Sequence, residues 1–230
     1  MTPPVVRRVG LLVLGLLVVL AAIFVAGRES GDPPPAGSAD SVRLGPEQGD
    51  DVAAYLARLP ALLPAAGAGP VPALVQFDAE LDAAAALTAV AGAQPGQVVF
   101  RVPLPRVQTA LRFQLLAAAP DSAAAAREID FARQRAEQDA ARDAAARTGR
   151  AAAVATAEAR ALAQPCRCVL AVLVHADRAT LDVIRARPGV RAVHAAPSRT
   201  AARDVALSPL LPEQQIAVTA TPDDGPVSGG

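Results

Sequence analysis

The stretch CVLAVLVHADRATLDVIRARPGVRAVHA spans residues 168–195 and decides the fold. Its first part, residues 168–175, is a short apolar run rich in Val and Leu, which predicts a buried strand. Residues 176–186 carry apolar side chains at helical spacing, and Pro188-Gly189 then marks a turn into a second predicted strand over residues 190–195. The stretch therefore predicts one strand–helix–strand unit.

An earlier part of the chain has the same order of elements. Residues 73–77 (ALVQF) predict a strand, residues 78–92 a helix that Asp78 caps and Gly92 ends, and residues 97–102 a second strand. Two such units, each with its crossover helix on one face, are the plan of a ferredoxin-like split βαβ fold. We therefore predict an α+β domain of this kind.

Between the two units lies an Ala- and Arg-rich segment, residues 121–164, which is predicted to be helical. Asp121 or Ser122 can cap its start, and Thr148-Gly149 offers a break, so one long helix and a helical hairpin are both open. Small residues recur on one face of this helix, which favours close packing against another helix over burial under a sheet. A solvated helix held up by the helix propensity of Ala is the alternative. The residues of this predicted interaction face are Ala125, Ile129, Ala132, Ala136 and Ala140.

The remaining segments of the predicted domain, residues 46–220, are less regular. Residues 46–63 show the spacing of one amphipathic helix, whereas residues 104–119 fit either a strand or a helix. Leu207 to Leu211 are expected to lie against the edge of the sheet. The last residues, 221–230, are rich in Pro, Asp and Gly and are predicted to be disordered.

The N-terminal region predicts a single-pass membrane anchor. Residues 9–27 are nineteen consecutive uncharged residues, which at about 1.5 Å per residue match a bilayer core. Arg7 and Arg8 precede this run, so residues 1–8 are expected to stay in the cytoplasm and the rest to be exported. Residues 28–45, rich in Pro, predict a spacer. A cleaved signal peptide is the alternative, since a positive start and an apolar core also fit one.

The distribution of charge along the chain limits the classes of partner that we expect. All acidic residues, and every arginine except Arg7 and Arg8, lie after residue 27, so the exported part is nearly neutral. It has no broad basic surface for a nucleic acid, and export argues further against such a partner. We therefore expect contacts with the membrane, through residues 9–27, and with another envelope protein or a second copy.

Cys166-Arg167-Cys168 is the motif with the clearest chemistry. The chain has two cysteines, and export would place them in an oxidising compartment, where a disulfide or a redox-active pair is expected. Two packed thiols are the alternative. A metal site built from this pair with His175 and His194 would have suitable ligand types, but the spacing matches no zinc pattern, so we predict no metal and no cofactor.

No motif for hydrolysis, group transfer or nucleotide binding occurs, so we predict a protein that is not an enzyme. Several carboxylates lie in the predicted helices, where exposed charge that keeps the protein soluble is the expected role. These residues are Glu80, Asp82, Glu128 and Asp130.

Two resemblances add expectations. Leu181-x-x-Ile184 followed by Pro188-Gly189-Val190-Arg191-x-Val193 resembles the closing βαβ unit of subtilase propeptide inhibitors, which are ferredoxin-like; the match covers roughly thirty residues, and no protease domain follows. The Arg-flanked anchor, the Pro-rich spacer, the C-x-C strand and the tail Pro209-Leu-Leu-Pro-Glu-Gln214 together resemble uncharacterised single-pass envelope proteins of actinobacteria. That second resemblance implies no activity.

These observations lead to three hypotheses of function. The first is a noncatalytic, membrane-anchored module that binds another protein outside the cytoplasm. The second is a thiol redox or metal-handling protein that acts through Cys166 and Cys168. The third is a propeptide-like protease inhibitor.

Overall fold

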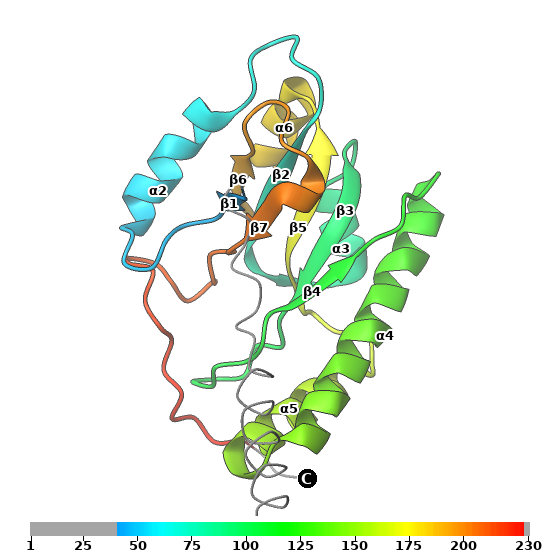
Figure 1. The fold of residues 1–230 in the computed structure, drawn as a ribbon, viewed down its shortest axis with the longest axis vertical. Helices are drawn as coiled ribbons and strands as arrows, with labels where there is room; N and C mark the ends of the chain where they lie inside the picture. Colours follow the sequence, from blue (N-terminus) through cyan, green and yellow to red (C-terminus); the bar gives the residue numbers. More distant parts are fainter. Residues whose placement is uncertain (1–40, 228–230) are drawn as a thin grey trace, which may run out of the picture. The chain divides into compact units, whose positions relative to one another are not determined.

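The computed structural model describes residues 41–227. Its centre is a five-stranded sheet in the order β4-β3-β5-β2-β6 (Figure 1), and every neighbouring pair is antiparallel. The strands are β2 (Val71–Leu81), β3 (Gln94–Phe100), β4 (Arg112–Leu115), β5 (Val169–Ala176) and β6 (Val190–Ala195). With the helices that pack on this sheet, the domain belongs to the α+β class, as the sequence predicted.

The two predicted strand–helix–strand units are both present. Helix α3 (Ala83–Ala89) joins β2 to β3, and helix α6 (Arg178–Arg185) joins β5 to β6. The units interleave, because β5 lies between β2 and β3 while β2 lies between β5 and β6. Most of the central strands are therefore bonded on both sides and covered on both faces, which explains why they read as continuous apolar runs.

The first helix begins later than the sequence predicted. Asp82, and not Asp78, caps α3, since its side chain accepts a hydrogen bond from the Ala85 N–H at 2.8 Å. The reason is that β2 continues through this region to pair Leu81 with Val169 of β5, after a register shift. Tertiary pairing therefore extends the strand into residues whose composition also suits a helix.

The Ala- and Arg-rich segment forms two helices, which settles the choice left open by the sequence. Helix α4 (Ser122–Ala146) starts at Asp121, whose side chain accepts from the Ala124 N–H at 2.7 Å. Helix α5 (Gly149–Leu162) follows after a break at Arg147 and Thr148. The two helices pack against each other as a hairpin beside the β3–β4 side of the sheet (Figure 1).

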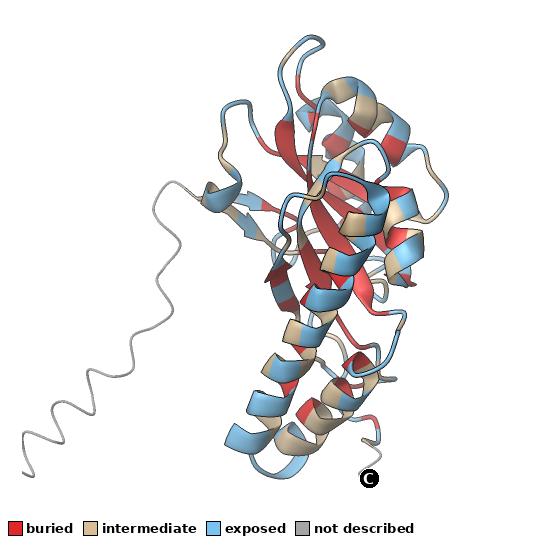
Figure 2. Ribbon diagram, turned by 90° about the vertical axis from the view of Figure 1, so that its right-hand side faces the viewer, coloured by how far each residue is buried: buried red, intermediate tan, exposed pale blue. Residues whose placement is uncertain are grey.

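The core lies on both faces of the sheet (Figure 2). One face is covered by α3, α4 and α6. The side chains that these helices bury are Ala86, Ala89, Ile129, Ala132, Ala136, Ala140, Leu181 and Ile184. The other face is covered in part by a two-stranded parallel ribbon of β1 (Val42–Leu44) and β7 (Val205–Leu207). Its buried residues are Leu44, Leu74, Val99, Leu170, Ala171, Leu173 and Ala196.

The predicted amphipathic helix over residues 46–63 is shorter than expected. It consists of helix α2 (Val52–Arg58) and the 3₁₀ turn η1 (Leu59–Leu62), which contains Pro60 at a position where its missing N–H costs nothing. These elements pack beside β6 and bury Tyr55 and Leu59. A second 3₁₀ turn, η2 (Ala202–Asp204), precedes β7.

Three terminal and connecting segments differ from expectation or were left open. The segment 104–119, which fitted either type, contains strand β4. Residues 42–44, at the end of the predicted spacer, form β1 because they pair with β7. Residues 221–227, predicted to be disordered, lie along the domain. They are held there by two ion pairs, Asp223 with Arg150 and Asp224 with Arg106.

Within residues 41–227 no helix has both the length and the apolarity needed to cross a bilayer. The predicted span, residues 9–27, lies outside the described residues.

Candidate functional site

Strand β4 has an inverted pattern of burial. Its polar side chains, Arg112 and Gln114, are buried, with 7% and 9% of their surface exposed, whereas Phe113 and Leu115 are 41% and 73% exposed. Successive residues of a strand point to opposite faces, so the polar side chains lie towards the helical hairpin and the apolar ones lie towards solvent. A single exposed apolar residue needs no explanation, but two on one strand opposite a buried arginine do.

The buried polar side of β4 is held by acidic residues of the hairpin. Arg112 donates to Glu158 of α5, which is itself buried, and to Asp143 of α4 at 3.1 Å. Gln114 donates to Asp139 of α4 at 2.7 Å. Buried ion pairs are costly to desolvate and add little net stability. Here they have a clear structural effect, because they fix the register that keeps the apolar side chains outward.

The outer edge of β4 also carries unpaired backbone groups. The pairs Val98–Gln114 and Phe100–Arg112 belong to the hydrogen-bonded set, as the nearby bond from the Leu116 N–H to Gly96 indicates. The backbone groups of Phe113 and Leu115 therefore point away from β3. Two contacts from α4 reach this side among the described residues: Arg135 donates to the Leu115 carbonyl at 2.6 Å, and just past the strand Glu128 accepts from the Ala117 N–H at 3.3 Å. Within residues 41–227, the N–H groups of Phe113 and Leu115 and the Phe113 carbonyl are left as the open part of the edge. Such an edge is a template for another strand.

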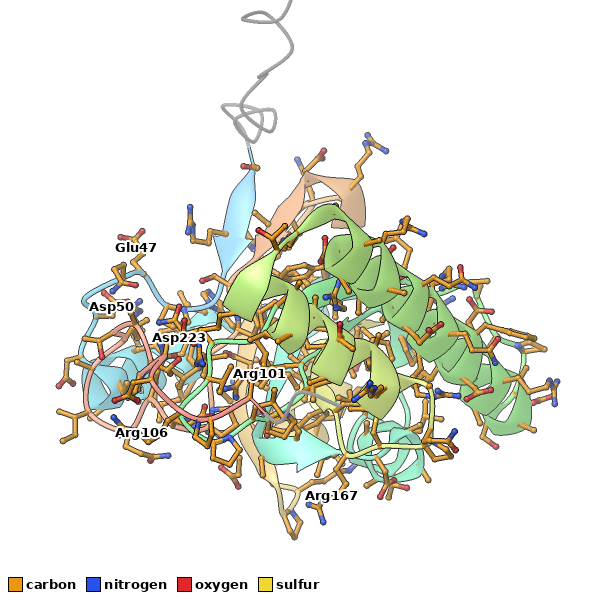
Figure 3. All side chains as sticks on the ribbon, turned by 90° about the horizontal axis from the view of Figure 1, so that it is seen from below. Glu47, Asp50, Arg101, Arg106, Arg167 and Asp223 are labelled. Carbon is orange, nitrogen blue, oxygen red and sulfur yellow. A yellow bond between two sulfur atoms is a disulfide. The ribbon has the colours of Figure 1, made fainter. Side chains whose placement is uncertain are left out.

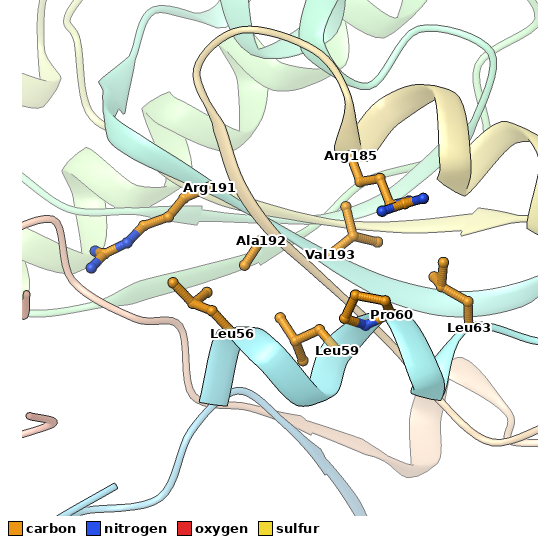
Figure 4. Close-up of a pocket in the computed structure, with 8 residues that line it drawn as sticks. All are labelled: Leu56, Leu59, Pro60, Leu63, Arg185, Arg191, Ala192 and Val193. Carbon is orange, nitrogen blue, oxygen red and sulfur yellow. The ribbon is translucent and has the colours of Figure 1, made fainter. Parts of the chain in front are cut away.

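The opposite edge of the sheet, at β6, is covered. Here η1 packs along the strand and leaves a hollow of about 140 Å³ (Figure 4). Two arginines line the hollow, but Figure 4 shows Arg185 and Arg191 pointing apart, so they do not form a common anion site. Arg191 instead donates to the carbonyls of Leu211 and Gln214. The volume is below the roughly 300 Å³ usual for a small-molecule site.

Two wider, open clefts lie near the helical hairpin. One, of about 490 Å³, is lined by α5 and by Asp223 of the C-terminal segment. Glu158, which also lines this cleft, is already bonded to Arg112 and to the Ala110 N–H. The other, of about 480 Å³, is largely apolar and lies between the end of α3 and the start of α4. The carboxylates that line the two clefts are already engaged: Glu158 and Asp223 accept from arginines, and Asp121 accepts from the Ala124 N–H as the cap of α4.

Cys166 and Cys168 form a disulfide in the connection between α5 and β5, with their Cα atoms 5.4 Å apart. Cys168 is buried and Cys166 is half-buried, while Arg167 between them lies at the surface (Figure 3). A small cavity of about 80 Å³ adjoins both cysteines, and Arg133 of α4 lines it.

The two histidines lie in different settings. His175 is exposed near the end of β5. His194 of β6 is partly buried: its Nδ1 accepts from the Gly45 N–H at 2.9 Å and lies 3.3 Å from the Tyr55 hydroxyl. Burial, together with the nearby Arg58, lowers the pKa of His194 to about 4. Burial also raises the pKa of Tyr55 to about 12. In the described part of the chain, no three His, Cys, Asp or Glu side chains gather as a metal site.

The predicted interaction face of the long helix lies inside the domain. Ile129, Ala132, Ala136 and Ala140 are buried in the core shared by α4 and the sheet, and Ala125 is half-buried near the helix start. These side chains pack against the domain's own elements. A partner would therefore have to displace the sheet or α5 to reach them.

The four carboxylates that the sequence placed at the surface have different roles. Glu80 is buried and pairs with Arg101 at 2.8 Å, and Arg101 (Figure 3) also binds Glu213. This corrects the expectation of an exposed Glu80; the cause is the extension of β2 past its predicted end. Asp82 caps α3. The remaining two lie on α4, where Glu128 faces Arg135, and Arg133 holds the pKa of Asp130 below its usual value.

The residues of β4 were not recognised from the sequence as a site. The run Arg112 to Leu115 alternates polar and apolar residues, and this pattern predicts a strand. The pattern does not predict which face of the strand is buried. The answer depends on Glu158, which lies 46 residues away in the chain.

Comparison of the chain with family models, with curated protein sequences and with solved structures gave no match.

Proposed function

We propose that the described domain is a noncatalytic protein-interaction module, held outside the cytoplasmic membrane by residues 9–27, that binds an extended segment of another envelope protein along β4. The observation that carries this proposal is the inversion of β4. A chain that buries Arg112 and exposes Phe113 and Leu115 loses apolar burial and gains a costly ion pair. That arrangement makes sense where the exposed face is covered by a partner.

The geometry of β4 favours an extended segment as the partner. Phe113 and Leu115 offer on the order of 200 Å² of apolar surface, well below the roughly 800 Å² that each side of a stable protein–protein interface buries. A second copy docking as a rigid body would thus gain little. An added strand gains main-chain hydrogen bonds from the free backbone groups and also covers both side chains, which is the common mode of strand addition.

We also propose that the core of the domain is ferredoxin-like, with β4, the helical hairpin and the β1–β7 ribbon as additions. Supporting this is the order β3-β5-β2-β6 with two crossover helices on one face. The resemblance of its second unit to subtilase propeptides remains a separate proposal. An inhibition assay of the full-length chain against subtilisin-type proteases tests it, and absence of inhibition would remove it.

Site-specific photocrosslinking in growing cells tests the proposed function. A photoreactive residue is placed at position 113 or 115 of the full-length chain, and crosslinked products are identified by mass spectrometry. We expect a discrete crosslink to an extended segment of one other envelope protein. Two results would contradict the proposal: no crosslink at either position, or crosslinks only to a second copy of this chain.

A matched control uses a different exposed apolar residue. Val183, on α6, is 57% exposed. Helix α6 packs against β6, which is the edge of the sheet opposite to β4. A photoreactive residue there is expected to give no product with the same partner. Replacing Phe113 by Asp, with the photoreactive residue at position 115, should abolish the specific crosslink, whereas Val183→Asp should leave it intact.

A further inference from the structure

The disulfide between Cys166 and Cys168 lies outside the interaction surface on β4 and encloses a single residue. A disulfide stabilises a fold mainly by restricting the unfolded chain, and this effect grows with the number of residues that the bond encloses. A ring closed across one residue therefore restricts the unfolded chain little. The bond is poorly suited to be a brace for the whole domain.

Hydrogen bonds hold the segment in place independently of the disulfide. The Cys168 N–H donates to the Leu81 carbonyl at 3.1 Å, and the Arg101 N–H donates to the Cys168 carbonyl at 2.8 Å. On the other side, Arg133 of α4 donates to the Leu162 carbonyl at the end of α5. The two cysteines should thus stay close together when the bond opens, which favours its re-formation.

The surroundings of the two sulfurs are unequal. Cys166 is half-buried, beside the exposed Pro165 and Arg167, whereas Cys168 is buried. An incoming thiol therefore reaches Cys166 first. The charged side chains that line the cavity adjoining both cysteines are Arg133, Asp130 and Asp82. The Asp82 carboxylate accepts from the Ala85 N–H as the cap of α3. A guanidinium stabilises a nearby thiolate through its positive charge. Arg133 is held in place by its hydrogen bonds to Asp130 and to the Leu162 carbonyl, so it acts on the cysteines by its charge.

We propose that Cys166–Cys168 is a thiol–disulfide exchange site whose partner is a dithiol. A thiolate of the dithiol attacks the sulfur of Cys166, and the Cys166–Cys168 bond breaks. Its electron pair goes to Cys168, which leaves as a thiolate beside Arg133 and takes up a proton. The second thiolate of the dithiol then attacks the dithiol's first sulfur, which is bonded to Cys166 in the mixed disulfide. A disulfide forms within the dithiol, the bond to Cys166 breaks, and Cys166 leaves as a thiolate and takes up a proton. Overall the dithiol loses two electrons and two protons, and this chain gains two thiols.

The first test asks whether the pair reacts in the folded protein. The full-length chain is treated with dithiothreitol, thiols are counted by alkylation, and melting is followed by circular dichroism. We expect reversible reduction of both cysteines with a melting temperature that stays nearly unchanged. Reduction that requires denaturant, or that lowers the melting temperature by more than about 10 °C, would show a structural brace and overturn the proposal.

The second test asks whether the two sulfurs have the predicted roles. In single-cysteine variants, Cys168→Ser leaves the accessible thiol and Cys166→Ser leaves the buried one. With an aromatic disulfide reagent we expect the Cys168→Ser variant to react at least about tenfold faster. Equal rates in two folded variants would contradict the assignment of Cys166 as the attacked sulfur.

The third test concerns Arg133, which we infer positions charge and does not itself react. Arg133→Gln should slow reduction of the disulfide by dithiothreitol several-fold at neutral pH, with a smaller difference at high pH, and Arg133→Lys should restore much of the rate. Arg127→Gln, an exposed arginine on the same helix, is the matched control and should behave as the wild type. Equal rates for Arg133→Gln and this control would remove Arg133 from the proposal.

Discussion

The two edge strands of the sheet, β6 and β4, are covered to different extents by the rest of the chain. Along β6, η1 and α2 cover the edge and bury Tyr55 and Leu59 against it. Along β4, the hairpin covers one face through buried polar contacts, while Phe113 and Leu115 face solvent. Natural sheets usually protect their exposed edges, so the difference between the two edges is the basis for proposing that a partner binds along β4.

The contrast extends to how each edge is held. The β6 side is held by apolar packing and by a neutral network in which Gln76 donates to the Tyr55 hydroxyl at 2.8 Å and accepts from the Leu210 N–H at 2.7 Å. The β4 side is held by charged groups, Arg112 with Glu158 and Asp143. Apolar packing tolerates small changes, whereas a buried charge is severely affected by loss of its partner.

The largest expected effect comes from the helix that covers the inner face of β4. Replacing Ala132, Ala136 and Ala140 together by Glu should prevent folding, because three charges would enter the core at a total cost above about 5 kcal/mol. The control replaces Ala126, Ala141 and Ala145, exposed on the same helix, by Glu and should stay folded. Circular dichroism melting distinguishes them. A cooperative melt in the core variant would mean that α4 does not pack as described.

The buried ion pair of β4 gives the next effect. Arg112→Met should cost about 3–5 kcal/mol in the free energy of unfolding, because Glu158 would be left charged and unpaired. Adding Glu158→Leu should recover most of this loss, since an apolar pair of similar volume is often as stable as a buried ion pair. Urea denaturation measures both. If the single variant loses less than about 1 kcal/mol, Arg112 is not buried as described.

On the β6 side a buried charge should destabilise the fold, whereas on the β4 side the charge of Arg112 is needed. The pKa of His194 is about 4 in the folded protein and about 6.5 when unfolded. The unfolded chain therefore binds the proton more readily, and stability should fall as the pH drops from about 6.5 to about 4. Because the ring is partly exposed, we expect a loss of about 1–2 kcal/mol at pH 4.5. His194→Gln should remove this part of the pH dependence, and an unchanged profile would place the ring in solvent.

The smallest effect on stability is expected on the open face of β4. Phe113→Asp and Leu115→Asp should each change the free energy of unfolding by less than about 0.5 kcal/mol, because these side chains are exposed. Denaturant titration checks this. A loss above about 2 kcal/mol for Phe113→Asp would show that the face is already covered within the chain, and the contrast between the two edges would fail.

The sequence predicted the β6 side far better than the β4 side, for a physical reason. Residues 168–195 contain consecutive apolar residues and a Pro-Gly turn, so their strands and helix are visible locally, and the structure has them within a few residues of the predicted ends. The start of α3 was misplaced because Asp78 and Asp82 are both good caps, and only pairing with β5 decides between them.

Strand β4 was not recognised because its burial is set by distant acidic residues and not by its own pattern. Its four residues fit a strand with either face inward, and the usual assumption would bury Phe113. The contacts with Asp139 and Glu158 reverse that choice. The cysteine pair, by contrast, was recognised from the sequence, because the predicted export would favour a bond between two cysteines two residues apart.

Amide hydrogen exchange tests the central claim, that the outer edge of β4 accepts an extended segment, most directly. In the full-length chain alone, the outward amides of Phe113 and Leu115 should exchange quickly, and that of Gln114, which bonds to β3, should exchange slowly. With a synthetic peptide of the crosslinked segment, we expect at least about tenfold slower exchange at Phe113 and Leu115 and no change in β6. Unchanged exchange at both outward amides, or new protection in β6 instead, would contradict the account.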